Sequence, residues 1–358
     1  MAKIRRYNSD FMSRQMDERL ELLEEDLTAL YARAVNDVKA EFTDWTAKND
    51  KKEKEMNEKL KNGDITEEEF SAWRKNAYLK DQRYKETINS MTDILVNTDK
   101  AAMAIVRGEL PLVVAESFNF TQALGFAAAD EAGLTVGTFQ IYNARTVQKL
   151  IKDNPDLLPY VDVSEDKKWN KKRINREITQ GIIKGEPLDK VADRLQNVTD
   201  MDSNAAVRNA RTAMTGAENL GRDEGFHELK DKGIPARMQW SATHDSRTRD
   251  THIMLDGTYQ DEDGYFGEGI LATPIQYPGD PAGDPEEIYN CRCRASLALE
   301  GIDHSQDDDL YEKFMKDNYP EDWEQVKKDR EDRESAYSSK KEGAPDRVKA
   351  RNERRRNG

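Results

Sequence analysis

The sequence predicts a mainly α-helical protein with one small α+β module near its C-terminal end. Charged residues make up 35% of the chain and the hydrophobic class only 36%, which is typical of long helices with narrow apolar faces. Apolar residues recur at three- and four-residue steps over long stretches. Residues 236–300 depart from this pattern, because Gly, Pro, Thr and aromatic residues concentrate there and residues 237–240 alternate as a strand does.

The N-terminal region, residues 1–90, has the pattern of a long helical hairpin. An Asn-Gly-Asp sequence at 62–64 interrupts the pattern, and Thr66 followed by Glu69 predicts a capping box that starts the second helix. We expect aromatic residues here, such as Trp45 and Trp73, to pack in the core or at an interface. The apolar face of the first helix contains Met12, Met16, Leu20, Leu23, Leu27, Leu30 and Tyr31.

The next region, residues 91–165, is predicted to be an apolar helical connector. Gly125, Gly133 and Gly137 interrupt it, which favours short helices and turns. Residues 166–302 are then read as one domain, in which helices precede the small α+β module with its long acidic loop. We expect a charged helix at 303–337 and a disordered basic tail at 338–358.

The net charge of −14 is distributed unevenly. Residues 251–290 contain nine Asp or Glu residues and no Lys or Arg, so they form an acidic loop. The negative total argues against a general nucleic-acid-binding protein, because DNA affinity comes mainly from phosphate neutralisation by Lys and Arg. The carboxylates that either coordinate calcium weakly or belong to a solvated loop are Asp261, Glu262, Asp263, Glu268, Asp280 and Asp284.

The C-terminal tail has the opposite charge. Val348 is its one large apolar residue, so the sequence predicts disorder. A single Glu353 faces a set of basic residues, and we expect these to contact DNA through charge, without sequence readout. The basic residues are Arg347, Lys349, Arg351, Arg354, Arg355 and Arg356.

Neither a membrane segment nor an export signal is expected. No apolar run approaches about eighteen residues, and no charged-then-apolar start is present. The two cysteines are separated by one residue and cannot staple a fold, which indicates a reducing compartment.

The residues with the most specific chemistry lie at the two ends of the module, which we expect to meet. Both cysteines of the chain and two of its four histidines are among them. The first end has the pattern Asp-x-x-x-Arg-x-x-His-x-x-x-Asp-Gly after a tryptophan, and the second end is Asn-Cys-Arg-Cys. The residues concerned are Trp240, His244, Asp245, Arg249, His252, Asp256, Gly257, Asn290, Cys291 and Cys293.

These residue types leave three hypotheses open. The first is a zinc site made by His252, Cys291 and Cys293 with His244 or Asp256 as fourth ligand, because thiolate and imidazole are preferred zinc donors. The second is a metal-free structural core, in which the cysteines are buried and Arg249 pairs with Asp256 or Asp245. In this hypothesis Asn290 caps a turn and His252 donates to a carbonyl.

The third hypothesis is catalysis, by a Cys nucleophile with a His base or by a His and Asp nuclease pair. The chain has no phosphate-binding or dinucleotide-binding glycine motif. We therefore expect no enzyme activity and no obligatory cofactor.

The pattern at the two ends of the module resembles the Mu F-like family of tailed-phage minor head proteins. Ala-Arg-Thr at 210–212 on the preceding helix and Pro-Gly-Asp at 278–280 are part of the resemblance. Some relatives place a second Cys pair near the His, where this chain has Thr243, Ser246 and Thr248. The resemblance implies a minor capsid protein inside the virion head near the portal, after assembly in the host cytoplasm. It implies a role in head morphogenesis, DNA packaging or DNA ejection.

The partners implied are the portal protein, the major capsid protein and, through the basic tail, packaged double-stranded DNA. No membrane partner is implied. One alternative is a cytoplasmic assembly scaffold or chaperone that is absent from the virion. The other is a Cys/His enzyme, a transferase or nuclease, in the C-terminal module; the short sequence after Asp303 argues against an added toxin or transferase domain.

Overall fold

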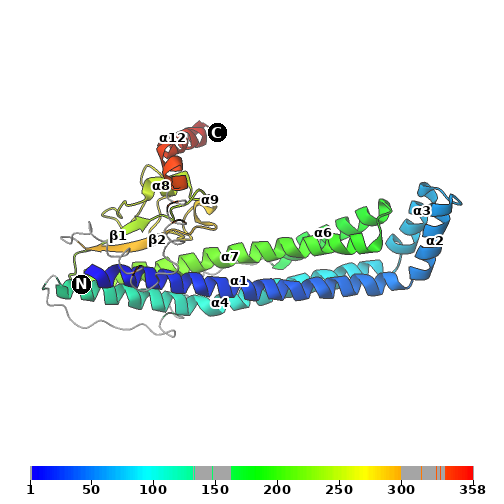
Figure 1. The fold of residues 1–358 in the computed structure, drawn as a ribbon, viewed down its shortest axis with the longest axis horizontal. Coiled ribbons are helices and arrows are strands. Elements are labelled where there is room, and N and C mark those ends of the chain that lie inside the picture. Colours follow the sequence, from blue (N-terminus) through cyan, green and yellow to red (C-terminus); the bar gives the residue numbers. More distant parts are fainter. Residues whose placement is uncertain are drawn as a thin grey trace. The chain divides into compact units, whose positions relative to one another are not determined.

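Long helices dominate the described part of the chain (Figure 1), which confirms the mainly α fold class predicted from the sequence. No described helix is both long enough and apolar enough to cross a membrane. The computed structural model describes residues 2–131, 163–299 and 335–357, together with Gly133, Val147, Lys316, Lys328 and Glu331. The long helices are α1 (Ala2–Ala47), α4 (Tyr84–Glu131), α6 (Val163–Ile183) and α7 (Leu188–Asp231).

The chain divides into two compact units, and α1, α4 and α7 each contribute residues to both. Unit 1 comprises Met1–Glu21, Arg107–Leu158 and Asn209–Gly358, and unit 2 comprises Leu22–Val106 and Pro159–Arg208. The core of unit 2 is helical, and its positions recur every three or four residues because each helix buries one face. These core residues are Ala34, Val38, Phe42, Trp45, Tyr78, Ile88, Met91, Leu95, Ile174, Ile178, Ile182, Val191, Leu195 and Val198.

The second long helix predicted within residues 1–90 is replaced by shorter elements. Gly63, with φ of 78°, ends α2 in the left-handed region that favours glycine. The predicted capping box is confirmed, since the Thr66 side chain accepts from the Glu69 N–H and the Glu69 carboxylate accepts from the Thr66 N–H. The elements are α2 (Asp50–Asn62), α3 (Glu67–Arg74) and a π-helical turn, η1 (Lys75–Leu79).

The prediction of short helices and turns within residues 91–165 is wrong for the described part up to Glu131, where α4 is continuous. The glycines in these helices permit close packing and do not end them. A Cβ atom on Gly125 would lie 2.3 Å from the Leu229 side chain of α7. Likewise, a Cβ atom on Gly221 of α7 would lie 2.3 Å from the carbonyl oxygen of Val114 in α4. Small residues thus allow the two backbones to approach within unit 1.

The predicted α+β module, residues 236–299, is present in unit 1. Its two strands pair antiparallel, from Ala236 opposite Leu299 to Ser241 opposite Arg294. Its core continues onto α7 through Phe226 and Leu229. The elements are β1 (Ala236–Ser241), α8 (Asp250–Leu255), α9 (Pro285–Ile288) and β2 (Arg294–Leu299).

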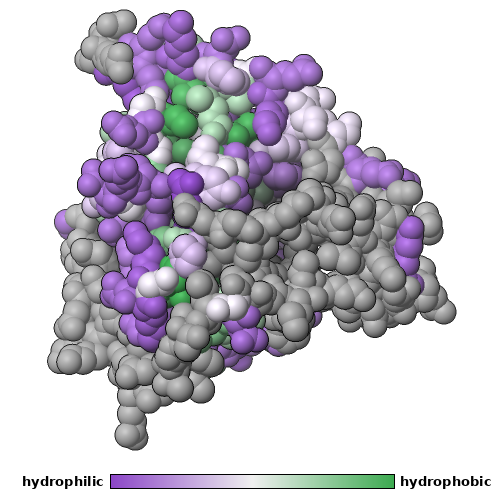
Figure 2. Space-filling model, turned by 90° about the vertical axis from the view of Figure 1, so that its left-hand side faces the viewer, coloured by the Kyte–Doolittle hydropathy of each residue, from purple (hydrophilic) through white to green (hydrophobic). Residues whose placement is uncertain are grey.

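The prediction of a disordered tail at 338–358 is wrong for residues 338–357. Residues 335–342 are helical and α12 spans Ala344–Asn357. Tyr337 and Ala344 are buried against Ile253 of α8, and Val348 is 4% exposed. A cluster of few apolar residues is sufficient here because carboxylates of the acidic module, such as Asp250, pair with basic residues of α12. Figure 2 shows the molecule from the left-hand side of Figure 1. Mainly hydrophilic side chains, with a few apolar ones between them, cover the upper part of the surface in this view. The charged helix predicted at 303–337 lies almost entirely outside the described residues.

Candidate functional site

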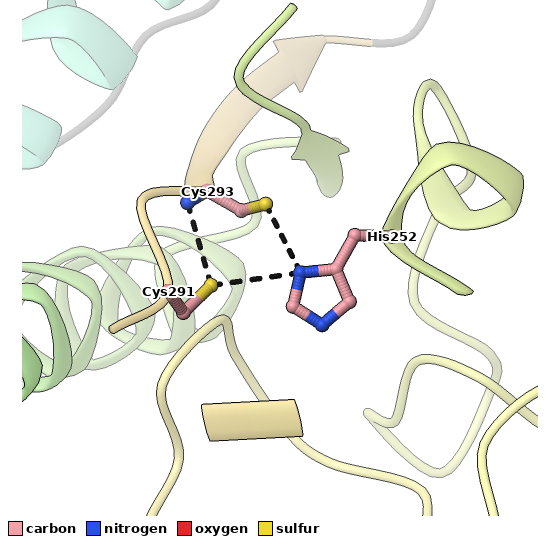
Figure 3. A group of neighbouring side chains, drawn as sticks. All are labelled: His252, Cys291 and Cys293. Carbon is pink, nitrogen blue, oxygen red and sulfur yellow. Dashed lines mark hydrogen bonds between the residues drawn. The ribbon is translucent and has the colours of Figure 1, made fainter. Parts of the chain in front are cut away.

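The two ends of the module meet at a cluster formed by His252, Cys291 and Cys293, which we call the Cys2His cluster. The Nδ1 atom of His252 faces both sulphur atoms (Figure 3), at 3.6 Å from Cys291 Sγ and 3.3 Å from Cys293 Sγ. The three residues are only 1%, 1% and 3% exposed. The sequence-based expectation that these residues come together is therefore met, inside the protein and away from solvent.

Local backbone geometry explains how the two cysteines converge. Residues i and i+2 of an extended chain point to the same face, and Cys293 directly precedes β2. Asn290, with φ of 56°, adopts the left-handed conformation that Asn tolerates, and this turns the chain just before Cys291. Trp240 of β1 packs with its edge against the His252 ring, with 5.1 Å between the ring centroids.

The protonation of the cluster is coupled. A hydrogen bond from Cys293 and the nearby His252 hold the pKa of the Cys291 thiol well below its ordinary value, against the effect of burial. The same bond to Cys291, together with burial, raises the pKa of Cys293 well above its ordinary value. Burial alone would lower the pKa of His252, but the charge of Cys291 and the nearby Glu287 carboxylate raise it. The cluster therefore favours a thiolate next to the imidazole.

A buried carboxylate supports the other side of the imidazole. Glu287 of α9 is 1% exposed, and its Oε2 lies 3.3 Å from His252 Nε2, although this contact is not a well-aligned hydrogen bond. Thr251 donates to the same oxygen at 2.8 Å, and Arg351 of α12 pairs with Oε1. Burial would raise the pKa of Glu287, but its contacts with His252, Arg351 and Thr251 lower it to about 2. Glu287 is therefore a charged residue between the cluster and α12, and sequence reasoning did not single it out.

The structure places neither proposed fourth zinc ligand in the cluster. His244 Nε2 lies 2.8 Å from Asp256 Oδ2, and the His244 ring stacks on Tyr337 with 4.2 Å between the centroids. Asp256 also accepts from the Tyr337 hydroxyl and from the Ala242 N–H. Both residues are thus engaged in attaching residues 335–342 to the module. The structure therefore does not place His244 or Asp256 as a fourth ligand, because contacts with each other and with Tyr337 engage both side chains away from the cluster.

The arginine pairing expected for the module also differs. Asp245 forms its two-pronged ion pair with Arg292, at 2.6 and 2.9 Å, and not with Arg249. These hydrogen bonds hold the pKa of the Asp245 carboxyl well below its ordinary value. Arg249 donates to the Tyr289 carbonyl instead. Arg292 lies between the two cysteines, just before β2, and from there its side chain reaches Asp245.

The remaining motif residues have structural positions. Gly257 has φ of 78° and donates its N–H to the Trp240 carbonyl at 2.9 Å, which closes the turn after α8. Asn290 lies against α7, where its N–H donates to Thr212 Oγ1 at 2.8 Å and its side chain accepts from Arg211 at 3.3 Å. The Ala-Arg-Thr sequence therefore contacts the Asn-Cys-Arg-Cys end directly.

A polar face of α7 anchors the cysteine segment, and sequence reasoning missed most of it. Thr215 Oγ1 donates to the Cys291 carbonyl at 3.0 Å. The buried Asn219 amide donates to the carbonyls of Cys293 and Pro278, at 3.1 and 2.9 Å, and accepts from the Ala295 N–H at 2.8 Å. Polar residues at 212, 215 and 219 lie on one helix face, and this spacing was the available signal.

The basic residues of α12 bind the module's own carboxylates. Arg347 contacts Asp250 through two nitrogens at 2.8 and 2.7 Å, and Arg351 pairs with Glu287. Arg355 pairs with Glu286, whereas Arg354 donates to a carbonyl within α12. The prediction that this tail is free to contact DNA thus needs correction for Arg347, Arg351 and Arg355, because the acidic module neutralises them. Lys349 is exposed, and the Arg356 side chain lies outside the described residues.

Two carboxylates of the acidic loop, Asp261 and Asp280, accept hydrogen bonds from backbone N–H groups in turns. Asp261 accepts from the N–H groups of Asp263 and Tyr265 at 3.1 and 2.8 Å. Asp280 accepts from the N–H groups of Gln276 and Ala282 at 2.9 Å each. Within the described residues, the Cys2His cluster is the one group of His, Cys, Asp and Glu side chains whose donor atoms lie close enough to share a metal ion.

The fold and the site together define a mainly helical protein that carries a small α+β module closed around a buried Cys2His cluster. Residues 172–296, from within α6 to within β2, match the family model described as Phage Mu protein F like protein. The resemblance to the Mu F-like family that the sequence suggested is confirmed over these residues.

The chain is also similar to two curated proteins. The chain is 27% identical to Minor head protein GP7 of Bacillus phage SPP1 over 164 residues, which are 46% of this chain and 52% of GP7. It is 30% identical to the NAD(+)--arginine ADP-ribosyltransferase EFV of Enterococcus faecalis (strain ATCC 700802 / V583) over 129 residues, 36% of this chain and 26% of EFV. The chain thus covers about a quarter of EFV and about half of GP7. No solved structure matches significantly.

Proposed function

We propose that this protein is a minor structural component of a tailed-phage head, bound inside the shell near the portal. There it acts in head morphogenesis, DNA packaging or DNA ejection through binding. The observation that supports this proposal most strongly is the Mu F-like match over residues 172–296, which includes the complete anchor between α7 and the module. The similarity to a protein named as a minor head protein supports the same function.

The proposed mechanism is docking. Residues 236–299 form a specific surface held against α7 by the Asn219 and Thr215 hydrogen bonds. Long charged helices offer extended contact surfaces for the portal protein and the major capsid protein, which we propose as partners. With three of its arginines paired, α12 is proposed to contact packaged DNA mainly through side chains that do not pair with the module, such as Lys349.

We propose no catalytic step. The thiol and imidazole groups of the cluster are almost fully buried, so a substrate atom has no access to them. The relative named as an ADP-ribosyltransferase shares only 26% of its length with this chain, so its activity is not transferred here. Purified full-length protein is expected to leave NAD+ intact in the presence of arginine, which liquid chromatography can measure.

Mass spectrometry of purified, DNA-filled heads tests the proposal. We expect the full-length protein in these heads at a low copy number relative to the major capsid protein. A variant that ends at residue 235 is expected to be absent, whereas a variant lacking only residues 338–358 is expected to be incorporated. Full-length protein that is found in assembly intermediates but absent from filled heads would instead identify a scaffold.

A further inference from the structure

The donor atoms of the Cys2His cluster have the arrangement of a transition-metal site. Zinc bonds to sulphur at about 2.3 Å and to nitrogen at about 2.0–2.1 Å, so a tetrahedral ion sets these ligands about 3.5–3.6 Å apart. The observed separations between His252 Nδ1 and the two sulphur atoms are 3.6 and 3.3 Å. All three donor atoms lie within 4.8 Å of one another. An ion can therefore reach all three donors with little movement of the side chains.

We propose that this cluster binds one Zn2+ ion through His252 Nδ1, Cys291 Sγ and Cys293 Sγ. Thiolate and imidazole donors select zinc over calcium or magnesium, which prefer oxygen ligands. Two thiolates neutralise the charge of the ion, so the complete site is acceptable in a buried environment. This inference goes beyond the proposed role in a phage head and does not depend on it.

The imidazole is oriented for metal binding by its surroundings. Ligating histidines commonly direct their second ring nitrogen to a carboxylate, which fixes the tautomer and makes the first nitrogen more basic. Glu287 lies in this position, 3.3 Å from His252 Nε2, and Thr251 and Arg351 hold its two oxygens. A metal ion on Nδ1 would leave the ring proton on Nε2, the nitrogen that lies nearest to the Glu287 carboxylate.

The backbone also prepares the sulphur atoms as ligands. The Cys293 N–H lies 3.4 Å from Cys291 Sγ and donates to it, which stabilises a thiolate. The carbonyl groups of both cysteines are held by Thr215 and Asn219 of α7, so the segment is fixed from the opposite side. The protein supplies three ligands, and the fourth position of the ion is completed by water or another small donor.

Metal content of the full-length protein tests this proposal. The protein is purified under reducing conditions, incubated with a small excess of Zn2+, desalted and analysed by inductively coupled plasma mass spectrometry. We expect about one zinc ion per chain in the wild type and nearly none in His252→Ala and Cys291→Ser. The matched control is His244→Ala, which removes a histidine of the same module and is expected to retain the zinc.

A second comparison remains informative if the ligand variants fail to fold. Glu287→Gln keeps all three donors, and we expect its zinc affinity to fall about 10- to 100-fold, measured by competition with a chelating dye. The neighbouring Glu286→Gln changes an exposed side chain and should leave the affinity unchanged.

Three results would overturn the assignment. The first is wild-type protein that holds no stoichiometric zinc while both thiols titrate as reduced. The second is equal loss of zinc in His244→Ala and His252→Ala, because His244 would then be a ligand. The third is a zinc content in Cys291→Ser and in Glu287→Gln equal to that of the wild type, because the ion would then lie outside the Cys2His cluster.

Discussion

Replacement of Asn219 by alanine should selectively destabilise the module. The fully buried amide joins α7 to two carbonyl groups and one N–H group of the module, at 2.8 to 3.1 Å. A buried polar group left without its partner costs about 1–3 kcal/mol. Three such groups lose their partner here, and water entering the space made by the shorter side chain recovers part of the loss. We therefore expect a destabilisation of about 3–5 kcal/mol.

Hydrogen exchange of the full-length protein, followed by mass spectrometry, reports this local loss. A cost of about 3 kcal/mol corresponds to a roughly 100-fold faster exchange of protected amides. We expect this acceleration in peptides from β1 and β2, and no change in peptides from α6. The control is Asn209→Ala at an exposed position of the same helix, expected to stay within about 0.5 kcal/mol of the wild type. Equal protection of the strands in both variants would refute the reasoning.

Three further predictions concern packing, pH and the tail. Gly221→Ala should destabilise unit 1 by about 1–3 kcal/mol in urea unfolding, because the added Cβ would lie 2.3 Å from a backbone carbonyl oxygen of α4. The control is Gly108→Ala, where the added Cβ lies in open space and should not destabilise the protein. Asp245→Asn should cost about 1–3 kcal/mol at pH 7. The pKa of this carboxyl is held below its ordinary 3.8, so its stabilisation is complete above that pH and is lost as the pH falls below it. The difference between wild type and variant should therefore shrink in acid; a constant difference would contradict the ion pair. Arg347→Ala should speed proteolysis of the tail at low salt relative to Arg354→Ala, and the contrast should fade at high salt.

Local signals in the sequence predicted local structure well. The capping box at Thr66 and Glu69 depends on residues three apart, and the structure contains it. The meeting of His252 with the two cysteines followed from the pattern at the module ends. The continuity of α4 did not follow, because a glycine in a helix looks like an interruption until its packing partner on another helix is known.

Features that depend on distant segments could not be predicted. Glu287 is one of nine acidic residues in residues 251–290, and no local rule tells which of them becomes buried beside His252. The order in α12 depends on carboxylates that lie far away in the sequence, such as Asp250. Composition alone predicted disorder for this tail, because composition does not reveal that an acidic surface lies beside it in the fold.

The carboxylate of Glu287 connects two parts of the molecule that differ greatly in exposure. One of its oxygens faces His252 in the interior, and the other pairs with Arg351 on α12. Thermodynamic reciprocity applies to this pair of contacts. If a change at the Cys2His cluster alters the free energy with which α12 binds the module, then binding of α12 alters the free energy of that change by the same amount. A polyanion that draws the helix away would leave this carboxylate buried without its cation. The far C-terminus is therefore energetically coupled to the centre of the module.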